Sequence, residues 1–444
     1  MTAPLAPAEA AGRILAAVTR QPPLRMPLDD ALGSILAAGA VSPLDIPPWT
    51  NSAMDGYAAR AADVRGASPD APRRLRVIEA IPAGAFPARS IGPGECARIF
   101  TGAPLPDGAD SVIRQEDTVA GSQGAGEPGN QGSVEIRNDR DCGVNFRKAG
   151  EDIRKGQVAL PEGTELGAAE LGVLASLAES QPLVYRRPRV AILGGGDEIV
   201  DVDQPEEIIA GRKVASSNSH TLHALVRLAG GVPVNLGIAR DTPESLRDHL
   251  VRATECDLLV TTAGISVGEH DHLRAVMESL GAEPGFWKLR MRPGAPVGFG
   301  ILRGVPWIGL PGNPVSTMVT FELFVRPAIR KMMGHSLPFR RAVPVQLAEP
   351  IRLGPSLQHF LRAVVEERDP VAALGMTSGS HRERSEAVSR VARLAGPQGS
   401  GILTSMVRAN ALLIIPEGQH ETPEGAPASA LVLNDPHHVA EPPW

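Results

Sequence analysis

The middle of the chain, residues 183–334, alternates short apolar runs with longer stretches in which apolar residues recur at helical spacing. An apolar run without polar alternation is typical of a strand buried on both faces of a sheet. Strands and helices that alternate in this way favour right-handed βαβ units. We therefore predict an α/β domain with a mostly parallel sheet, whose strands cover residues 190–193, 234–238, 258–260, 286–291, 297–302 and 305–310.

The strand at Leu258–Val260 leads directly into a loop of small residues that ends at Asp271. Apolar residues at helical spacing follow, and Gly281 ends that helix. In an open α/β sheet, ligands bind where such loops leave the carboxyl ends of strands, because backbone N–H groups and a helix N-terminus converge there. Glu269 and Asp271 would repel a bare phosphate but would hold a divalent cation against one. The loop indicates either metal-assisted phosphate chemistry or a tight turn whose acids cap the next helix.

Two further loops leave the same predicted edge of the sheet. Residues 311–314 read Pro-Gly-Asn-Pro, which predicts a helix that starts at Pro314, runs to Gly334 and has free N–H groups at its beginning. Those groups form either a second anion site or an ordinary helix start. Residues 194–198 read Gly-Gly-Gly-Asp-Glu, and this run lacks the G-x-G-x-x-G spacing of a dinucleotide site.

Outside this domain the pattern changes twice. Residues 51–146 show short strands with frequent Gly and Pro turns, which is typical of a small β-rich domain. We expect it to be inserted into one discontinuous helical and linker domain formed by residues 1–50 and 147–182. Residues 335–444 again predict strands and a C-terminal β domain. The fold class is therefore a multidomain α/β protein, and the helices predicted outside the α/β domain lie near residues 10–18, 29–38 and 168–177.

Composition narrows the classes of function. Aromatic residues make up 3% of the 444 residues and the formal net charge is -6. Both values argue against a nucleic-acid partner, which needs stacking platforms and a cationic surface. The three cysteines are far apart and odd in number, which fits a reducing compartment without structural zinc. No apolar run resembles a signal peptide or a membrane span, so we expect a cytoplasmic protein without a membrane partner.

A stiff loop opens the β-rich domain. Residues 45–58 hold two adjacent prolines, which rule out a helix, followed by polar residues beside Gly56. Asp55 in this loop is either a carboxylate presented at fixed geometry or an ordinary turn residue, and composition alone favours the turn. A second rigid turn, residues 101–110, begins with the hydroxyl of Thr101.

Several short motifs occur in the same order as in the molybdopterin molybdenumtransferases, the MoeA family that includes the E domain of gephyrin. A match at residues 399–410 extends the resemblance to almost the whole chain. One such motif would be weak evidence, but the ordered set is specific. The other motifs are Asn51-Ser52-Ala53-Met54-Asp55-Gly56-Tyr57-Ala58, Thr101-Gly102-Ala103-Pro104, Gly150-Glu151-Asp152-Ile153, Gly196-Asp197-Glu198, Ser266-Val267-Gly268 and Gly309-Leu310-Pro311-Gly312-Asn313-Pro314-Val315-Ser316.

The resemblance implies a homodimer that inserts molybdate into adenylylated molybdopterin with Mg²⁺ and releases AMP. It places the site between the α/β domain of one subunit and the loops around Asp55 and Thr101 of the other. Molybdopterin adenylyltransferase and recipient molybdoenzymes are further candidate partners. By motif match, the catalytic residues are Asp55, Thr101, Asp152 and Glu198, the metal ligands are Glu198, Asp241 and Asp271, and the substrate-binding residues are Gly264, Ser266, Gly268, Lys288, Arg292, Pro311, Gly312, Asn313 and Ser316.

The sequence also departs from the family pattern on the anion-binding side. Residues 292–296 read Arg-Pro-Gly-Ala-Pro where the family commonly has Lys-Pro-Gly-Lys-Pro, so a cation is lost at Ala295. The changes at Gly195, Ala263 and His272 fall beside the same loops. Three functions stay open: the transferase, a paralogue that binds molybdopterin or hands it on without turnover, and the related adenylyl transfer, which the four-domain length disfavours. The sequence does not distinguish molybdate from tungstate.

Overall fold

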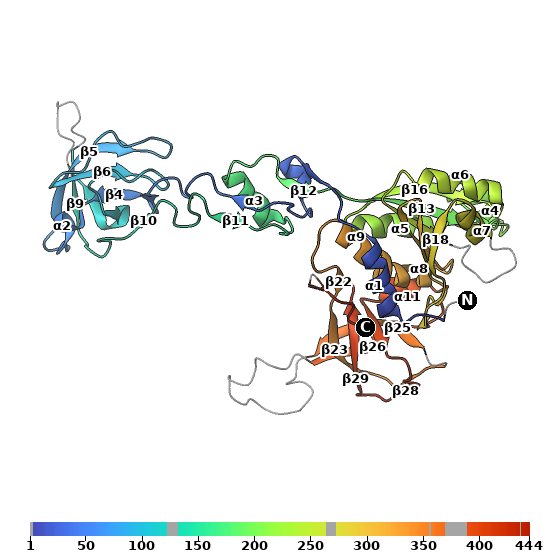
Figure 1. Cartoon of the computed structure of the whole chain (residues 1–444). Helices are drawn as coiled ribbons and strands as arrows, with labels where there is room; N and C mark the ends of the chain where they lie inside the picture. The colour runs from blue at the N-terminus through green and yellow to red at the C-terminus, as the bar shows by residue number, and fades with distance from the viewer. Residues whose placement is uncertain (1–2, 122–131, 263–271, 355–356, 369–388, 436) are drawn as a thin grey trace. The chain divides into compact units, whose positions relative to one another are not determined.

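The computed structural model describes residues 3–121, 132–262, 272–354, 357–368, 389–435 and 437–444. The chain forms two compact units, and Figure 1 shows the elements of each. Within the described residues, no helix is long and apolar enough to cross a membrane. The large unit comprises Met1–Met26, Gly33–Ala37 and Leu183–Trp444, and the small unit comprises Pro27–Leu32 and Ala38–Pro182.

The large unit contains a six-stranded sheet with the order β16-β13-β17-β21-β20-β18. The first four strands are parallel, whereas β20 pairs antiparallel with both β21 and the edge strand β18, so the sheet is mixed. Five of the six predicted strands are confirmed. The bounds are Val232–Ala239 for β16, Arg189–Gly195 for β13, Leu258–Thr262 for β17, Val305–Leu310 for β21, Gly298–Leu302 for β20 and Ala282–Phe286 for β18.

The strand predicted at residues 286–291 is wrong. The edge strand β18 ends at Phe286, and a separate two-residue strand, β19, covers Met291–Arg292. Pro284 and Gly285 resemble a turn in the sequence. At the edge of a sheet, however, the missing N–H of a proline costs no ladder hydrogen bond, so the strand continues through both residues.

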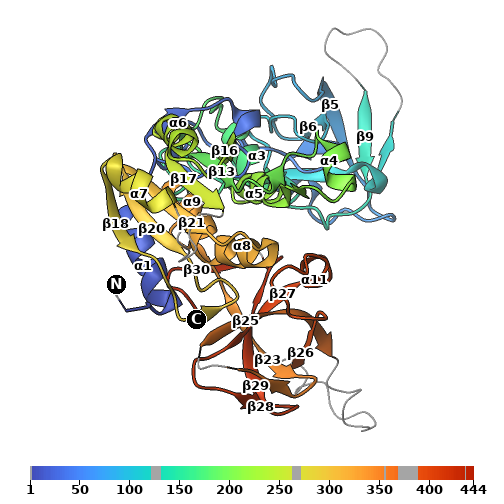
Figure 2. The same cartoon turned by 90° about the vertical axis from the view of Figure 1, so that its right-hand side faces the viewer.

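Helices cover both faces of this sheet (Figure 2). Successive residues of β13 point to opposite faces, so Val190 and Ile192 enter one core while Ala191 and Leu193 enter the other. This explains the continuous apolar runs of the central strands. The first face is covered by α1 (Pro7–Ala17), α5 (Ser217–Leu228), α8 (Pro314–Thr320) and α9 (Arg326–Met332), and the second by α6 (Pro243–Ala253) and α7 (His272–Ser279).

The N-terminal segment differs from our expectation in two ways. We grouped residues 1–50 with residues 147–182, but Ala10 and Ile14 of α1 are buried in the core of the large unit and α1 contacts α9. The helix predicted at residues 29–38 is wrong, because only the 3-10 turn η1, Leu28–Ala31, forms there. Gly33 follows with φ +72, a left-handed conformation that ends helical geometry. The other domain boundaries stay a prediction.

The C-terminal part of the large unit is a small closed barrel. Its strands pair in the order β25-β26-β23-β29-β27, and β27 pairs back with β25. Closure removes the exposed sheet edges, and apolar side chains fill the interior. The bounds are Gln358–Arg368 for β25, Ser389–Leu394 for β26, Ala342–Leu347 for β23, Pro427–Val432 for β29 and Ala411–Ile415 for β27.

The small unit is built on a six-stranded sheet with the order β7-β4-β6-β5-β9-β8, and it has one apolar core on each face. The helix predicted at residues 168–177 is confirmed as α3, Ala168–Ser176, and it contacts η1. The sheet bounds are Ser111–Arg114 for β7, Gly56–Ala59 for β4, Glu95–Ile99 for β6, Arg73–Ile81 for β5, Ser133–Ile136 for β9 and Thr118–Ala120 for β8.

Candidate functional site

Asp55 of the small unit lies at the entry to β4, where the chain leaves the short strand β3, Asn51–Ser52. Its Oδ1 accepts two hydrogen bonds from Thr101, one from the backbone N–H and one from the hydroxyl, each of 2.8 Å. Its backbone carbonyl accepts the N–H of Gln115 at 3.2 Å. The carboxylate is therefore fixed in direction while the side chain remains exposed to solvent.

Gly56 allows this entry into the sheet. A Cβ at Gly56 would lie 2.0 Å from the carbonyl oxygen of Ile113 on the neighbouring strand β7. Real Cβ atoms do not approach backbone oxygens so closely, and therefore only glycine lets β4 lie against β7 at this point. Packing against β7 therefore requires Gly56, and Asp55 lies just before the first residue of β4.

The surroundings of Asp55 favour its charged form. The backbone N–H and the hydroxyl of Thr101 lower the pKa of Asp55, and the positive charge of Arg98 lowers it further. Arg98 is itself held over the rings of Tyr57 and Phe100, at 5.0 and 5.1 Å from their centroids. Asp55 is thus an oriented anion at neutral pH, which can hold a cation or align a ligand.

Asp152, the other acid predicted for this unit, is exposed. Its backbone N–H donates to the carbonyl of Ile46 at 3.0 Å. The structure brings Asp55 and Thr101 together, but among the described residues it gives no contact between Asp152 and that pair.

In the large unit, a cavity of about 520 Å³ lies where β13, β17 and β21 end. We call it the Glu198 cavity, because Glu198 is the acid among its described lining residues. Its walls include the backbone of Gly194 and Gly195, Thr262 at the end of β17, and residues 311–314. This is the edge at which the α/β topology predicts ligand binding.

The loop that carries Glu198 is tied to the loop of Asp241. The carboxylate of Asp197 accepts the N–H of Asp241 at 3.2 Å, and the carbonyl of Asp197 accepts a hydrogen bond from Lys213 at 2.6 Å. A Cβ at Gly196 would lie 2.7 Å from a carboxylate oxygen of Glu198, so the side chain of Glu198 folds back over this glycine. The exposed carboxylates of Glu198 and Asp241 therefore lie on two loops that are hydrogen-bonded to each other.

These donors fit Mg²⁺ in type. Mg²⁺ takes oxygen ligands, usually one or two carboxylates together with substrate phosphates and water. Glu198 and Asp241 offer such carboxylates, whereas Asp271 lies outside the described residues. In the described part of the chain, no three His, Cys, Asp or Glu side chains gather as a metal site. The donor set therefore suits a cation that is shared with a phosphate of the substrate.

A second cavity of about 540 Å³ lies in the same unit, and we call it the Arg362 cavity. Residues 291–296, Ser316 of α8 and Gln398 contribute to its walls. Three arginines, Arg292, Arg352 and Arg362, reach its lining, and no acid occurs among its described lining residues. Such a lining attracts anions.

Arg362 is the buried cation of this cavity. Its side chain is fully buried and donates to the hydroxyl of Ser405 at 3.0 Å and to the carbonyls of Pro397 and Gly399 at 3.1 and 3.0 Å. Burial lowers the pKa of Arg362, although an arginine remains charged at neutral pH. Its described partners are neutral oxygens, so its charge is not cancelled by a carboxylate. Arg352, in contrast, pairs with Glu421 at 3.0 Å.

The predicted free N–H groups at the start of α8 are only partly free. The N–H of Val315 donates to the carbonyl of Ser400 at 3.0 Å, which links the helix to the barrel. Pro314 has no N–H, and Asn313 as the cap makes no side-chain cap bond. The prediction missed this because a residue 85 positions later supplies the acceptor.

The two cavities share walls, because Pro296, Pro311 and Asn313 line both. Most predicted substrate residues that the structure describes lie there. Lys288 is exposed and lies outside the described lining of both cavities. Arg292, Pro311, Asn313 and Ser316 line the Arg362 cavity, Pro311, Gly312 and Asn313 line the Glu198 cavity, and Gly264, Ser266, Gly268 and Asp271 lie outside the described residues.

Sequence reasoning missed Arg352, Arg362 and Gln398. Arg362 carries a signal in the sequence, because it interrupts the apolar strand residues 360–365, where a charge is expensive unless it has a role. Arg352 and Gln398 lie in polar segments and carry no such signal.

Three protein-family models together match nearly the whole chain. Residues 5–178 match the MoeA N-terminal region (domain I and II), residues 191–331 match a probable molybdopterin binding domain, and residues 344–433 match the MoeA C-terminal region (domain IV). The chain belongs to the MoeA family. The match to the probable molybdopterin binding domain contains the Glu198 cavity loops, and the match to the MoeA C-terminal region contains Arg352 and Arg362.

Individual relatives are also similar to this chain over most of its length. A molybdopterin molybdenumtransferase of Nostoc sp. is 34% identical over 88% of this chain and 84% of its own, and that of Bacillus subtilis is 32% identical over 94% and 91%. A crystal structure of a molybdopterin biosynthesis moeA protein from Pyrococcus horikoshii OT3 is 28% identical, with a TM-score of 0.75 over 97% of this chain and 100% of that chain. The similarity thus extends over all regions of the chain and not only over the α/β domain.

Proposed function

We propose that this protein is a molybdopterin molybdenumtransferase, which inserts molybdate into adenylylated molybdopterin with Mg²⁺ and releases AMP. The observation that carries the proposal is the pair of adjoining cavities, one lined by the carboxylate of Glu198 and the other by three arginines, of which the buried Arg362 has only neutral oxygens among its described partners. A phosphorylated ligand with its cation fits the first, and a small oxyanion fits the second.

Each cavity has a separate task in this proposal. Glu198 and Asp241, together with Asp271 by motif match, would hold the cation, and Mg²⁺ would neutralise the phosphate charge that develops as the anhydride breaks. Residues 311–314 and the backbone at Gly195 would position the phosphate. The exposed Arg292 would bind the tetrahedral oxyanion, and the buried charge of Arg362 in the same cavity wall would attract the same anion, so that it lies beside the pterin.

Asp55 and Thr101 complete the proposed site. We infer a homodimer in which the Asp55 loop of one subunit serves the cavities of the other, as the family resemblance implies. Light scattering at micromolar concentration tests this part, and a monomer would contradict it. Asp152 is assigned to the catalytic set by motif match.

The alternative is a paralogue that binds molybdopterin, or hands it to a partner, without turnover. The observation that favours it is Ala295 in the wall of the Arg362 cavity, where the family commonly has a lysine. Arg352 lines the same cavity but is paired with Glu421, so it replaces that charge only in part.

The experiment is single-turnover release of AMP by the purified chain from adenylylated molybdopterin, Mg²⁺ and molybdate. Release that depends on both Mg²⁺ and molybdate supports the transferase. Tight pterin binding without AMP release would support the paralogue instead. Replacing molybdate by tungstate in the same assay distinguishes the two oxyanions, which have the same shape and charge.

A further inference from the structure

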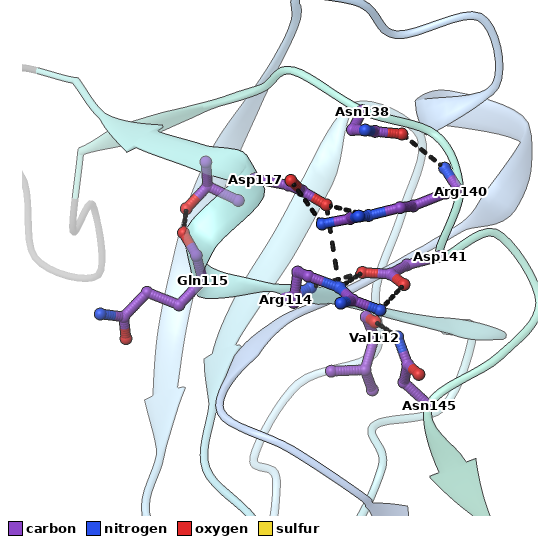
Figure 3. Close-up of polar contacts among 9 residues, drawn as sticks. Val112, Arg114, Gln115, Asp117, Asn138, Arg140, Asp141 and Asn145 are labelled. Atoms are coloured by element: carbon purple, nitrogen blue, oxygen red, sulfur yellow. Dashed lines mark hydrogen bonds and ion pairs between the residues drawn. The ribbon is translucent and has the colours of Figure 1, made fainter.

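The small unit holds a buried carboxylate close to the loop of Asp55. Asp141 is 1% exposed, and its carboxylate accepts three hydrogen bonds from Arg114 (Figure 3): from the backbone N–H at 3.0 Å, from Nε at 2.9 Å and from Nη2 at 2.9 Å. A buried acid is tolerated only when it is paired and hydrogen-bonded in this way. The two side chains together fix the end of β7.

One line of contacts runs from Asp141 through Arg114 to Asp55. Arg114 is the last residue of β7 and lies opposite Gly56 in β4. The next residue, Gln115, donates its N–H to the carbonyl of Asp55 at 3.2 Å. Fixing the end of β7 therefore fixes the backbone of Asp55 itself.

A second line runs from Asp141 through Asn145. The side chain of Asn145 donates to the carbonyl of Val112 at 2.9 Å, and it also helps to lower the pKa of Asp141. The carbonyl of Asn145 accepts the N–H of Ala53 at 2.8 Å, two residues before Asp55. Asn145 has φ 70, a left-handed conformation that asparagine tolerates better than most residues and glycine tolerates freely.

An outer ion pair extends the cluster away from Asp55. Arg140 donates from Nε and Nη2 to the carboxylate of Asp117, at 2.7 and 2.9 Å, as Figure 3 shows. Asp117 closes the 3-10 turn η2, Gln115–Asp117, which begins with the residue that contacts Asp55. Arg140 is half exposed, so its pair is screened by water and contributes less than the Asp141 pair.

We propose that Asp141 is a positioning residue, which holds the loop of Asp55 from both sides through Arg114 and Asn145. This inference rests on the proposed function for its consequence, because a displaced Asp55 matters only if Asp55 acts on the ligand. The physical reason is geometric. A reacting group that moves by about 1 Å loses up to about 100-fold in rate, even when the change is remote from the chemistry.

The test uses three variants of the full chain. Asp141→Asn removes the charge on which Arg114 depends, and Asn145→Gly keeps the left-handed backbone but removes the side-chain bonds. Asp139→Asn is the matched control, because its carboxylate accepts the N–H of Gly66 at 2.8 Å and no described contact joins it to Asp55. We expect AMP release to fall about 10-fold to 100-fold in Asp141→Asn and less in Asn145→Gly, with pterin binding unchanged, and to stay unchanged in Asp139→Asn.

Two readouts separate positioning from simple stability. Hydrogen exchange should speed up at the amides of Ala53 and Gln115 in Asp141→Asn, while the amides of β5 and β9 keep their protection. Combining Asp141→Asn with Asp55→Asn should cost little more activity than Asp55→Asn alone, since both changes disable the same group.

Each outcome decides the inference. Unchanged exchange at Ala53 and Gln115 would overturn it, whether or not the wild-type chain releases AMP. Faster exchange with full activity would also overturn it, as would fully additive losses in the double variant. If Asp141→Asn fails to fold, Asn145→Gly gives the same comparison in a milder form. A wild-type chain that releases no AMP would instead refute the proposed function, and the exchange data would still report whether Asp141 holds the loop.

Discussion

Asp55 in the small unit and Arg362 in the large unit are both oriented by hydrogen bonds, but Asp55 is exposed whereas Arg362 is fully buried. Asp55 contributes little to any core, and its partners could be satisfied by water. Arg362 is itself fully buried, and so is Ser405, whose hydroxyl accepts one of its hydrogen bonds. Replacing Asp55 should therefore cost function alone, whereas replacing Arg362 should cost function and stability together.

The largest effect is expected for Asp55→Asn. The amide oxygen of asparagine can still accept both hydrogen bonds from Thr101, so the loop keeps its shape and only the charge is lost. We expect single-turnover AMP release to fall by about 100-fold or more, comparable to removing one electrostatic group from a transition state. The thermal midpoint and pterin binding should stay at wild-type values.

Asp107→Asn is a suitable control for this change. Asp107 is an exposed acid in the turn that follows Thr101, and in its described hydrogen bond its backbone carbonyl accepts the N–H of Ile91. The control should keep wild-type rates. A wild-type rate in Asp55→Asn would refute the catalytic role of this carboxylate.

The sequence predicted local features well and long-range contacts poorly. The strand Leu258–Thr262 and the helix α3 follow from apolar periodicity, which is a local property. Ser400 as the acceptor for Val315 and the burial of α1 in the large unit depend on contacts between distant segments. The same limit applies to the site, where the Asp55 motif marked the acid but not Asp141 as its support.

The second prediction concerns Ala295, which lines the Arg362 cavity. Ala295→Lys adds a cation where the family commonly has one, so binding of the anionic pterin and of molybdate should tighten. The gain should be about 1.5–3 kcal/mol, the range for a hydrogen bond to a charged group. Equilibrium titration measures it, and Val251→Lys on the exposed side of α6 is the charge-matched control. Unchanged or weaker binding would mean that Arg292 and Arg352 already organise the cavity.

The third prediction tests the buried side of the comparison. Arg362→Lys keeps the charge but loses the planar fork that reaches Ser405, Pro397 and Gly399. The hydrogen bond to the buried hydroxyl of Ser405 should be lost, which costs about 1–3 kcal/mol. We expect a lower thermal midpoint for the large unit together with weaker molybdate binding. A stable Arg362→Lys protein with unchanged binding would show that charge alone suffices in this cavity.

The smallest effect concerns acid and again separates the two units. His335 of the large unit is 9% exposed, and its Nδ1 lies 2.8 Å from Nη2 of Arg330. Burial lowers the pKa of His335 to about 3, and the nearby charges of Arg330, His438 and Arg326 act in the same direction. Below its unfolded pKa of 6.5 the unfolded chain binds a proton that the folded chain excludes. The stability contributed by neutral His335 is therefore complete above pH 6.5 and is lost as the pH falls toward 3, at about 1.4 kcal/mol per pH unit.

In the small unit, Asp55 and Asp141 have lowered pKa values, so their contributions to stability decline only below about pH 4. Between pH 7 and pH 5 the large unit should lose about 2 kcal/mol from this group while the small unit loses little. Hydrogen exchange resolved by unit at the two pH values measures the difference, and His335→Asn should flatten the pH dependence of the large unit alone. An equal response of both units to acid, or an unchanged response in the variant, would contradict the assignment to His335.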